Sequence, residues 1–320
     1  MSIVTAKEPS LVGAQVGIDV AQDWLDVSVD GGKAFRVSND DAGIVSLMGR
    51  LSEGATVHLE ASGGYERVAR RRLVEAGFVV RTLDPLKVRR SAQSKGKNGK
   101  TDSLDARHLS EEGSSLQAHP PKSGFREELC DLSRTLDQLK SAASEMKLRA
   151  NVPGLDPMAV ETLIAASGLL RKEAAKLERE FVKRVKSSPL KERYLLAQSI
   201  PGVGPCLARV LVCELPEDLE AFTDAQLTSY GGVAPLDNSS GKRKGKARIG
   251  RGNARIKGAL YMPALNCVQR QEWARSLYAR LKAKKHEHQQ AVVAVMRRLL
   301  LRAVQVLRRG TPWQTDRAQA

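Results

Sequence analysis

Hydrophobic and polar residues alternate along the first part of the chain in three short runs. The runs are AQVGIDV, WLDVSVD and KAFRVSN, within residues 14–38, and they are separated by Gln22-Asp23 and Gly31-Gly32. Alternation with a period of two, interrupted by turn residues, is typical of paired antiparallel strands. The pattern therefore predicts a three-stranded meander.

The following segment mixes the periods of helices and strands. Residues 40–51 and 65–76 have helical spacing, whereas residues 56–62 and 78–84 have the pattern of strands. A short helix is expected after Pro85, and another near Thr101, whose hydroxyl suits an N-cap. We therefore expect a mixed α/β domain over residues 11–124.

From Phe125 to Lys186 the strand pattern disappears, and apolar residues recur every three or four positions. The spacing predicts two long helices that are separated near residues 152–157, because Pro153 and Pro157 cannot lie inside a regular helix. We expect residues 125–193 to form a helical coiled-coil arm that acts as a spacer or a dimerisation element. Extra helices packed on a neighbouring domain are an equally good interpretation.

The last part of the chain, residues 194–320, is predicted to be mainly helical. A helix, a turn at Gly202–Gly204 and a second helix are expected at its start. One long amphipathic helix is expected from Trp273 to Arg309, with an apolar stripe on one side and arginines on the other.

The net charge of the chain indicates what kind of partner it binds. The 320 residues leave room for two or three domains, and 52 Lys and Arg against 36 Asp and Glu give a net charge of +16. No stretch approaches 18 uninterrupted apolar residues, so we expect no membrane span. A polyanion is therefore the expected partner.

The positive charge is unevenly distributed. Residues 1–60 carry a net −5, and Lys242–Lys257 contains eight basic residues, no acidic residue and several glycines. This segment is expected to be a flexible loop that contacts phosphates, with a solvated basic face as the alternative.

The cysteines indicate a reducing environment. The four of them lie far apart without a C-x-x-C pair, which argues against a zinc knuckle and against a disulfide framework. The first ten residues lack the pattern of a secretory signal, so we expect a cytoplasmic protein.

Four acidic residues stand out by position. Asp19 and Glu60 each end a predicted strand, and Asp102 and Asp105 share one face of a predicted helix. Converging carboxylates repel one another unless a cation neutralises them, and their hard oxygens favour Mg²⁺ or Mn²⁺. Such a site would serve phosphoryl transfer on nucleic acid. Taken singly, each acid is more simply a turn or cap residue.

These residues are part of a linked set of motifs. In order, the motifs are Gly17-Ile18-Asp19-Val20, Leu59-Glu60-Ala61-Ser62-Gly63-Gly64-Tyr65, Lys100-Thr101-Asp102-Ser103-Leu104-Asp105-Ala106, Ile200-Pro201-Gly202-Val203-Gly204, Tyr230-Gly231-Gly232-Val233-Ala234-Pro235, Ser239-Ser240-Gly241 and Gly252-Asn253-Ala254-Arg255. The set resembles the DEDD recombinases of insertion-sequence family 110. The resemblance implies a RuvC-like domain of ribonuclease H fold at residues 11–124 and a transposase domain at residues 194–320. It also implies that Asp19, Glu60, Asp102 and Asp105 are the acids of the DEDD pattern.

A polar turn, residues 236–241, precedes the basic segment. By chemistry alone, a serine here is usually a turn residue, although nearby cations would stabilise an alkoxide and a phosphate. The resemblance implies that a serine in this motif attacks DNA and becomes covalently linked to it. We expect this serine to be Ser240, with Ser239 as the alternative.

Further residues are expected to contact nucleic acid. The Gly202–Gly204 turn is similar to the hairpin of helix-hairpin-helix proteins, in which glycines let the backbone approach phosphate, and a plain tight turn is the alternative. The full expected set is Lys95, Lys97, Lys100, Gly202, Gly204, Lys242, Arg243, Lys244, Lys246, Arg248, Arg251, Arg255 and Lys257.

The sequence therefore predicts a transposase or site-specific recombinase that cleaves and exchanges DNA strands. The resemblance implies donor and target DNA as substrates, a non-coding bridge RNA as guide, and a dimer or dimer of dimers. Two alternatives remain: a metal-dependent junction-resolving nuclease without a covalent intermediate, and a non-catalytic regulator that binds nucleic acid.

Overall fold

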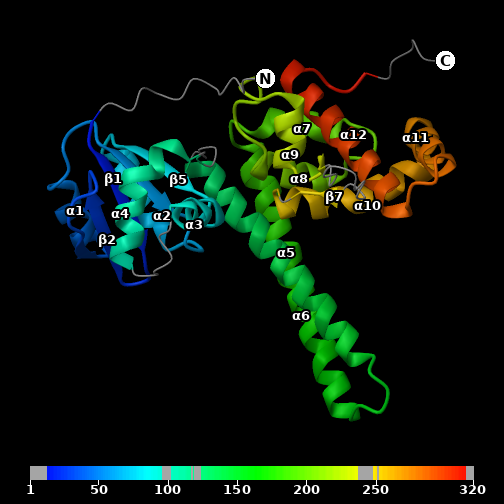
Figure 1. Cartoon of the computed structure of the whole chain (residues 1–320). Coiled ribbons are helices and arrows are strands. Elements are labelled where there is room, and N and C mark those ends of the chain that lie inside the picture. Colours follow the sequence, from blue (N-terminus) through cyan, green and yellow to red (C-terminus); the bar gives the residue numbers. More distant parts are fainter. Residues whose placement is uncertain are drawn as a thin grey trace. The chain divides into compact units, whose positions relative to one another are not determined.

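The computed structural model describes residues 13–95, 102–116, 118, 124–236, 248–250 and 252–314, of which residues 102–104, 236 and 248 are described by their backbone alone. The chain divides into two compact units between residues 121 and 122. The first is a mixed α/β unit and the second is mostly helical, as the sequence predicts (Figure 1).

A five-stranded sheet forms the centre of the first unit. Its strands are β1 (Gln15–Val20), β2 (Trp24–Val29), β3 (Phe35–Ser38), β4 (Thr56–Glu60) and β5 (Val79–Leu83), arranged in the order β3-β2-β1-β4-β5. The predicted meander is confirmed, since β1, β2 and β3 pair antiparallel in sequence. β4 pairs parallel with β1, and β5 parallel with β4.

Alternation along β1 divides the sheet into two faces. Val16, Ile18 and Val20 are buried in a core that also contains Ile44 and Leu73. The last two residues come from helices α1 (Asp41–Met48) and α2 (Glu66–Glu75), which therefore cover this face. Gly17 and Asp19 belong to the opposite face.

Helix α4 (Asp102–Glu112) covers that opposite face and packs against β1, β2 and β4 (Figure 1). The contact at Gly17 is between backbones, because a Cβ there would lie 2.1 Å from the carbonyl oxygen of Ala106 and 2.3 Å from the amide nitrogen of Ser110. Helix α3 (Pro85–Ser94) precedes α4, and a short 3-10 turn, η1 (Gly113–Ser115), follows it. Glycine at position 17 thus lets α4 lie directly on the central strand.

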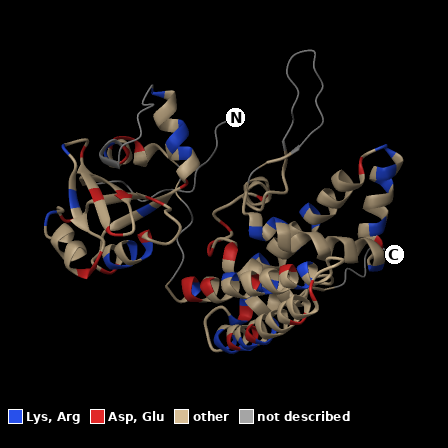
Figure 2. Ribbon diagram, turned by 90° about the horizontal axis from the view of Figure 1, so that it is seen from below, with Lys and Arg blue, Asp and Glu red and all other residues tan. Residues whose placement is uncertain are grey.

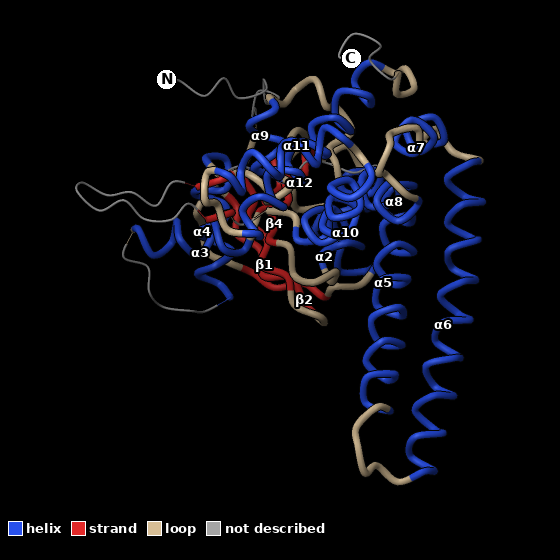
Figure 3. The backbone as a smooth tube through the Cα atoms, turned by 90° about the vertical axis from the view of Figure 1, so that its right-hand side faces the viewer, coloured by secondary structure: helices blue, strands red, loops and turns tan. Residues whose placement is uncertain are grey.

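Two long helices begin the second unit. They are α5 (Gly124–Ala150) and α6 (Pro157–Lys186), which lie side by side and run in opposite directions (Figure 3). The predicted break is confirmed: Pro157 occupies the first turn of α6, where a missing N–H costs nothing, and Asp156 caps the helix by accepting from the amides of Met158 and Ala159.

The remaining helices pack around a continuous aliphatic core. They are α7 (Lys191–Gln198), α8 (Pro205–Glu214), α9 (Asp224–Tyr230), α10 (Ala254–Arg270), α11 (Glu272–Ala283) and α12 (His288–Arg309), with a small antiparallel pair formed by β6 (Pro235–Leu236) and β7 (Arg248–Ile249). The core includes Leu211 on α8, Leu260 on α10 and Leu299 on α12. The helix, turn and helix predicted around Gly202–Gly204 are present as α7 and α8.

The single helix predicted from Trp273 to Arg309 is wrong, because the chain breaks between α11 and α12. Lys285 adopts a left-handed backbone conformation with φ of 62°. Glu287 then starts α12 in a reciprocal capping box with Gln290. A capping box supplies hydrogen bonds for the first amides of a helix, so it favours a new start over a continuous helix.

Two further features concern cysteine and tryptophan. All four cysteines are free, and only Cys206 is exposed. Each tryptophan stacks with an arginine: the guanidinium of Arg36 lies 4.8 Å from the ring of Trp24, and that of Arg302 lies between Trp273, at 3.9 Å, and Trp313, at 5.1 Å. In the described part of the chain, no helix has the length and apolar character needed to cross a membrane.

Candidate active site and nucleic-acid interface

Asp19 and Glu60 occupy neighbouring positions at the same end of the sheet. The parallel register pairs Ile18 with Leu59, so the next residues, Asp19 and Glu60, come next to each other. Paired residues of adjacent strands lie on the same face, and for Asp19 this is the face that α4 covers. The expected proximity of these two strand-end acids is thus a feature of the sheet register.

A third carboxylate continues this row on the other side of Asp19. Asp26 on β2 pairs directly with Asp19 in the antiparallel register. Its two oxygens accept hydrogen bonds of 3.0 and 2.7 Å from the guanidinium of Arg36, the residue opposite it on β3. This bidentate pair neutralises the charge of Asp26 beside Asp19. Sequence analysis missed Asp26, because its position within a strand shows no sign of a partner until the register is known.

Helix α4 brings the other two predicted acids toward this end of the sheet. Near its end, Ser110 accepts a 3.1 Å hydrogen bond from the amide of Gly31, which follows β2 and lies beside the beginning of β1. The first turn of α4 therefore extends toward the opposite end, where β1 and β4 finish. Asp102 starts that turn, and Asp105 lies half-buried within it.

The grouping of these acids around an ion remains a prediction. Among the described side chains, no three His, Cys, Asp or Glu residues are placed to hold a metal ion. The side chain of Asp102 lies outside that description, while Asp19, Glu60 and Asp105 each have an interaction partner within the chain. In donor chemistry the set fits a hard divalent cation, because every donor is a carboxylate oxygen.

The turn after Glu60 is ordered by one buried carboxylate. A single oxygen of Glu66 accepts from the amide and hydroxyl of Ser62 and from the amide of Gly64, at 2.9–3.2 Å. Gly63 and Gly64 both have positive φ, 75° and 122°, which only glycine adopts easily. This arrangement fixes the chain between Glu60 and α2.

His58 lies two residues before Glu60 and is fully buried. Burial lowers the pKa of His58 to about 4, and the positive charge of Arg81 adds to the effect. The imidazole is therefore neutral at pH 7, and its Nε2 lies 2.8 Å from the side-chain oxygen of Gln15.

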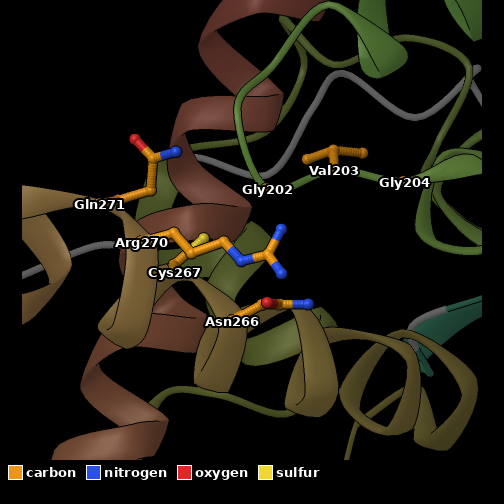
Figure 4. Close-up of a pocket in the computed structure, with 7 residues that line it drawn as sticks. All are labelled: Gly202, Val203, Gly204, Asn266, Cys267, Arg270 and Gln271. Carbon is orange, nitrogen blue, oxygen red and sulfur yellow. The ribbon is translucent and has the colours of Figure 1, made fainter.

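In the second unit, a pocket of about 350 Å³ lies beside the predicted glycine turn. It is lined by Gly202, Val203 and Gly204 and, from the end of α10, by Asn266, Cys267, Arg270 and Gln271. Figure 4 shows the side chains of Arg270 and Asn266 extending into the space next to the turn. Arg270 is exposed, so this wall of the pocket presents a cation to solvent.

The two glycines of this turn have different local requirements. Gly202 has a φ of 96°, and a Cβ there would lie 2.3 Å from the sulfur of Cys267, so both backbone conformation and packing require glycine. Gly204 has open space around its Cα and forms the N-cap of α8 without a side-chain hydrogen bond to the helix. The backbone at Gly204 is therefore open to solvent beside α8.

The predicted nucleophiles, Ser239 and Ser240, lie outside the described residues. The strands before and after them are described: Pro235 pairs with Ile249, and Leu236 with Arg248. Next to this strand pair, the segments before and after the serines pack closely against each other. A Cβ on Gly252 would lie 2.4 Å from the amide nitrogen of Gly232. The described residues on the two sides of the serine-bearing segment (residues 237–247) thus lie close together.

The predicted nucleic-acid contacts remain predictions, and the structure describes only some of these residues. Lys97, Lys100, Lys242, Arg243, Lys244, Lys246 and Arg251, and the side chain of Arg248, lie outside the described residues. Lys95 forms an ion pair with Glu112, and Arg255 donates to Glu214 and Asp137. Lys257 is half-buried in the first turn of α10. Lys and Arg of both units are interleaved with Asp and Glu on many of the helices (Figure 2).

Two family models match the chain. The model described as "Transposase", DEDD type of IS110, matches residues 16–152, and the model described as "Transposase IS116/IS110/IS902 family" matches residues 194–279. Together they cover parts of both structural units, including β1, β4 and the Gly202–Gly204 turn. The chain belongs to the IS110 family of transposases.

Relatives within and around the IS110 family agree with this placement. An uncharacterized 43.6 kDa protein of insertion element IS110 from Streptomyces coelicolor is 27% identical over 183 residues, which cover 57% of this chain and 44% of that protein. An uncharacterized 44.8 kDa protein of insertion element IS116 from Streptomyces clavuligerus is 33% identical over 109 residues, or 33% of this chain and 27% of that one. The chain thus spans less than half the length of these two relatives.

A third relative matches along almost its whole length. It is a pilin gene-inverting protein from Moraxella lacunata, 24% identical over 318 residues that cover 93% of this chain and 97% of that protein.

In this IS110-family protein, the structure adds four residues that sequence analysis did not single out, two at the carboxylates of the first unit and two at the pocket of the second. They are Asp26, Glu66, Asn266 and Arg270. A signal existed for Glu66, because an acid four residues after Ser62 suits a cap over a glycine turn. None existed for Asn266 and Arg270, which reach the turn only through the packing of α10 against the loop before α8.

Proposed function

We propose that this protein is a DNA transposase or site-specific recombinase of an insertion sequence. The observation that supports this most directly is the register of β1 and β4, which brings Asp19 and Glu60 to adjacent positions on the face covered by α4. The matches to transposase family models and the similarity to a pilin gene-inverting protein support the same activity.

We propose a RuvC-like ribonuclease H fold for the first unit. The strand order β3-β2-β1-β4-β5, with three antiparallel strands followed by two parallel ones, supports this assignment. Helices on both faces leave the carboxyl ends of β1 and β4 as the place where a substrate meets the acids.

The carboxylates fit a divalent cation, Mg²⁺ or Mn²⁺, held by Asp19, Glu60, Asp102 and Asp105. When bound, such an ion neutralises the repulsion among the acids and stabilises negative charge on a phosphodiester oxygen. Arg36 keeps Asp26 out of this set by neutralising it, and Glu66 holds the turn that follows Glu60.

The second unit supplies the nucleophile in this proposal. The hydroxyl of Ser240, or of Ser239, attacks the scissile phosphorus and gives up its proton as the serine O–P bond forms. The bond between phosphorus and the departing nucleotide oxygen breaks, and that oxygen takes up one proton, so the step balances. The product is a serine–DNA phosphodiester. The hydroxyl of a second DNA end attacks this phosphodiester and releases the serine, so strands are exchanged without net hydrolysis. Lys242, Arg243 and Lys244 follow in the sequence, and in this proposal their positive charges offset charge on the phosphate.

Donor and target DNA, a non-coding bridge RNA and a second copy of the chain are the proposed partners. The pocket beside Gly202 and Gly204 supports a phosphate contact, because Arg270 adds a cation to a turn whose Gly204 backbone is open to solvent. The α5–α6 helices are proposed as an arm that assembles two or four subunits.

Cleavage of labelled plasmid DNA that carries the element's ends, together with RNA from the adjacent non-coding segment, tests this proposal. We expect the wild-type protein with Mg²⁺ to cut the DNA and to form an adduct that survives denaturation. Removing both serines (Ser239→Ala with Ser240→Ala) should abolish the adduct, and Asp19→Asn with Asp102→Asn should abolish cutting and adduct together. Glu53→Gln is the matched control, because Glu53 is exposed and precedes β4 at the other end of the sheet.

The outcomes separate the alternatives. A protein without both serines that still cuts DNA, with no adduct, would be a metal-dependent nuclease. Full activity of the variant with both Asp19→Asn and Asp102→Asn would contradict the proposed role of the carboxylates. Inactivity of the wild type on every DNA and RNA combination, with binding retained, would indicate a regulator.

A further inference from the structure

Arg255 joins two helices through a single guanidinium. One terminal nitrogen donates to Glu214 on α8 at 2.5 Å, and the other donates to Asp137 on α5 at 2.6 Å and to the hydroxyl of Ser133 at 2.7 Å. Arg255 lies in the first turn of α10, so α10 begins at a junction with both helices.

The junction is partly buried and contains a second arginine. Arg209 on α8 is 2% exposed, and it donates to the other oxygen of Asp137 at 2.6 Å and to the carbonyl and hydroxyl of Ser133, both at 2.7 Å. Glu214 is 3% exposed. Two arginines and two carboxylates thus satisfy one another, with Arg209 and Glu214 buried and 40% of the Asp137 side chain exposed. The planar, bidentate pairing makes the geometry specific.

The same junction holds the point where the serine-bearing segment rejoins the unit. Asn253 donates from its side chain to Glu214 at 3.1 Å and from its backbone to the carbonyl of Tyr230 at 2.6 Å. Its side-chain oxygen caps α10 by accepting from the amides of Arg255 and Ile256. The phenol of Tyr230 in turn donates to the carbonyl of Glu214 at 2.8 Å.

Glu214 is therefore bonded to both sides of the segment. In the sequence, Tyr230 precedes residues 237–247 and Asn253 follows them. Their direct hydrogen bond and the close approach of Gly232 and Gly252 bring the two sides together.

We propose that Arg255 is a positioning residue that fixes the base of the serine-bearing segment, through Glu214 and Asp137, for strand cleavage. This inference rests on the proposed function of Ser240. It gives Arg255 a different part from the phosphate contact expected from sequence, because its guanidinium is turned toward two carboxylates of the same unit.

Substitution of Arg255 by lysine tests this positioning role. It keeps the positive charge, so it preserves general attraction to nucleic acid, but a single ammonium cannot span Glu214 and Asp137 as the planar guanidinium does. A variant Arg255→Lys should therefore loosen the junction while leaving the net charge of the protein unchanged.

Arg308→Lys is the matched control. Arg308 is also an arginine of the second unit, with 20% of its side chain exposed against 22% for Arg255. It binds Asp224 and the carbonyls of Leu219 and Phe222, none of which belongs to the base of the segment. The two substitutions remove comparable hydrogen bonds at different places.

The first experiment measures DNA cleavage at saturating nucleic acid, the dissociation constant for the same DNA, and thermal stability. A misplaced nucleophile commonly costs about a hundredfold in rate. We expect Arg255→Lys to slow cleavage by about 10- to 100-fold, with a dissociation constant changed less than about threefold. Arg308→Lys should lower the melting temperature comparably and leave the cleavage rate near that of the wild type.

Two results would overturn the proposal. If Arg255→Lys and Arg308→Lys slow cleavage equally, Arg255 has only a general structural role. If Arg255→Ala weakens binding, lowers the slope of log affinity against log salt by about one, and leaves the saturated rate intact, Arg255 is a phosphate contact.

A second measurement does not depend on catalysis. Hydrogen exchange of the full chain should speed up at residues 229–236 and 252–256 in Arg255→Lys, while the amides of α12 keep their protection. Unchanged exchange at these residues would reject the positioning role. If exchange responds as expected but removal of both serines leaves cleavage intact, then the junction is as proposed and the nucleophile assignment is what failed.

Discussion

At the scale of single residues, Gly17 shows how one side chain decides the architecture around the acids. The residue separates two hydrophobic positions of β1, and nothing larger than hydrogen fits beneath α4. Because the opposing atoms belong to the helix backbone, no side-chain rotation relieves the clash. The position of Asp105 relative to Asp19 thus depends on Gly17, which has no side chain and no functional group.

We expect Gly17→Ala to destabilise the first unit by about 2–4 kcal/mol, since α4 must move off the sheet. Urea denaturation measures the loss, and cleavage activity should fall with it. Gly49→Ala is the control in the same unit, because its Cβ would meet nothing closer than 3.7 Å and its φ of −67° suits any residue. Equal stability of the two variants would show that α4 does not rest on β1 as described.

Asp137 gives the second unit a response to acid. Burial acts to raise the pKa of Asp137, but the hydrogen bonds and charges of Arg209 and Arg255 outweigh it, and the pKa lies below its ordinary value of 3.8. The unfolded chain therefore takes up this proton first as the pH falls. The stabilisation from Asp137 is complete above about pH 4 and disappears at lower pH.

Asp137→Asn should cost about 0.5–1.5 kcal/mol at pH 7, a figure kept low because 40% of the Asp137 side chain is exposed, and the difference from wild type should be smaller at about pH 3. Chemical denaturation at the two pH values measures this. Glu173→Gln serves as control, because its ion pair with Lys176 is exposed and should contribute less than about 0.5 kcal/mol at either pH. A constant difference between Asp137→Asn and wild type across this range would contradict the assignment.

At the scale of elements, the α5–α6 hairpin contains two glycines with opposite requirements. Gly168 lies inside α6 with open space around it, whereas Gly154 lies in the connection and has a φ of 79°. Alanine favours a helix interior but is strained at positive φ. Gly168→Ala should therefore stabilise the second unit by about 0.5–1 kcal/mol, and Gly154→Ala should destabilise it, as measured by thermal or urea unfolding. Effects of the same sign would argue against this helix boundary.

Most elements follow from local pattern, because their hydrophobic period and their caps agree. The meander, the strands β4 and β5, and the proline-separated helices α5 and α6 are of this kind. The break before α12 escaped prediction because no proline or glycine marks it, although residues 284–290 contain no apolar residue. The capping box of Glu287 and Gln290 starts the new helix.

The candidate site could be predicted only in part. Strand-end acids are visible in the sequence, but their adjacency depends on β1 pairing with β4 across residues 21–55, which contain β2, β3 and α1. Asp26 and Arg36 were invisible for the same reason, since their meaning comes from cross-strand register. Arg255 seemed to belong to the basic segment, and only the packing of α10 against α5 and α8 reveals its two carboxylate partners.

At the scale of the whole molecule, the two units have separate hydrophobic cores. Val16, Ile18 and Leu59 belong to one cluster, and Leu211, Leu260 and Leu299 to another, with no buried residue in common among those described. We therefore expect two calorimetric transitions. Gly17→Ala should lower only one of them, and a single transition that shifts as a whole would show that the units unfold together.

The net charge of +16 predicts strongly salt-dependent binding of nucleic acid. Replacing Lys242, Arg243, Lys244 and Lys246 with glutamine should reduce the slope of log affinity against log salt by about three to four for duplex DNA. Fluorescence anisotropy at several salt concentrations measures it. Replacing Lys172, Arg179 and Lys183 on α6 gives a control of similar charge, and an equal change in slope would argue against a specific contact by the basic segment.

The division of the three tryptophans, each stacked on an arginine, between the two units has a practical consequence. Trp24 is the sole indole of the first unit, and Trp273 and Trp313 flank one guanidinium in the second. Replacing Trp24 with phenylalanine confines the emission spectrum to the second unit, and the converse double replacement confines it to the first. Ultraviolet fluorescence, without any attached dye, thereby becomes a separate optical reporter for each unit of the protein during titration with nucleic acid.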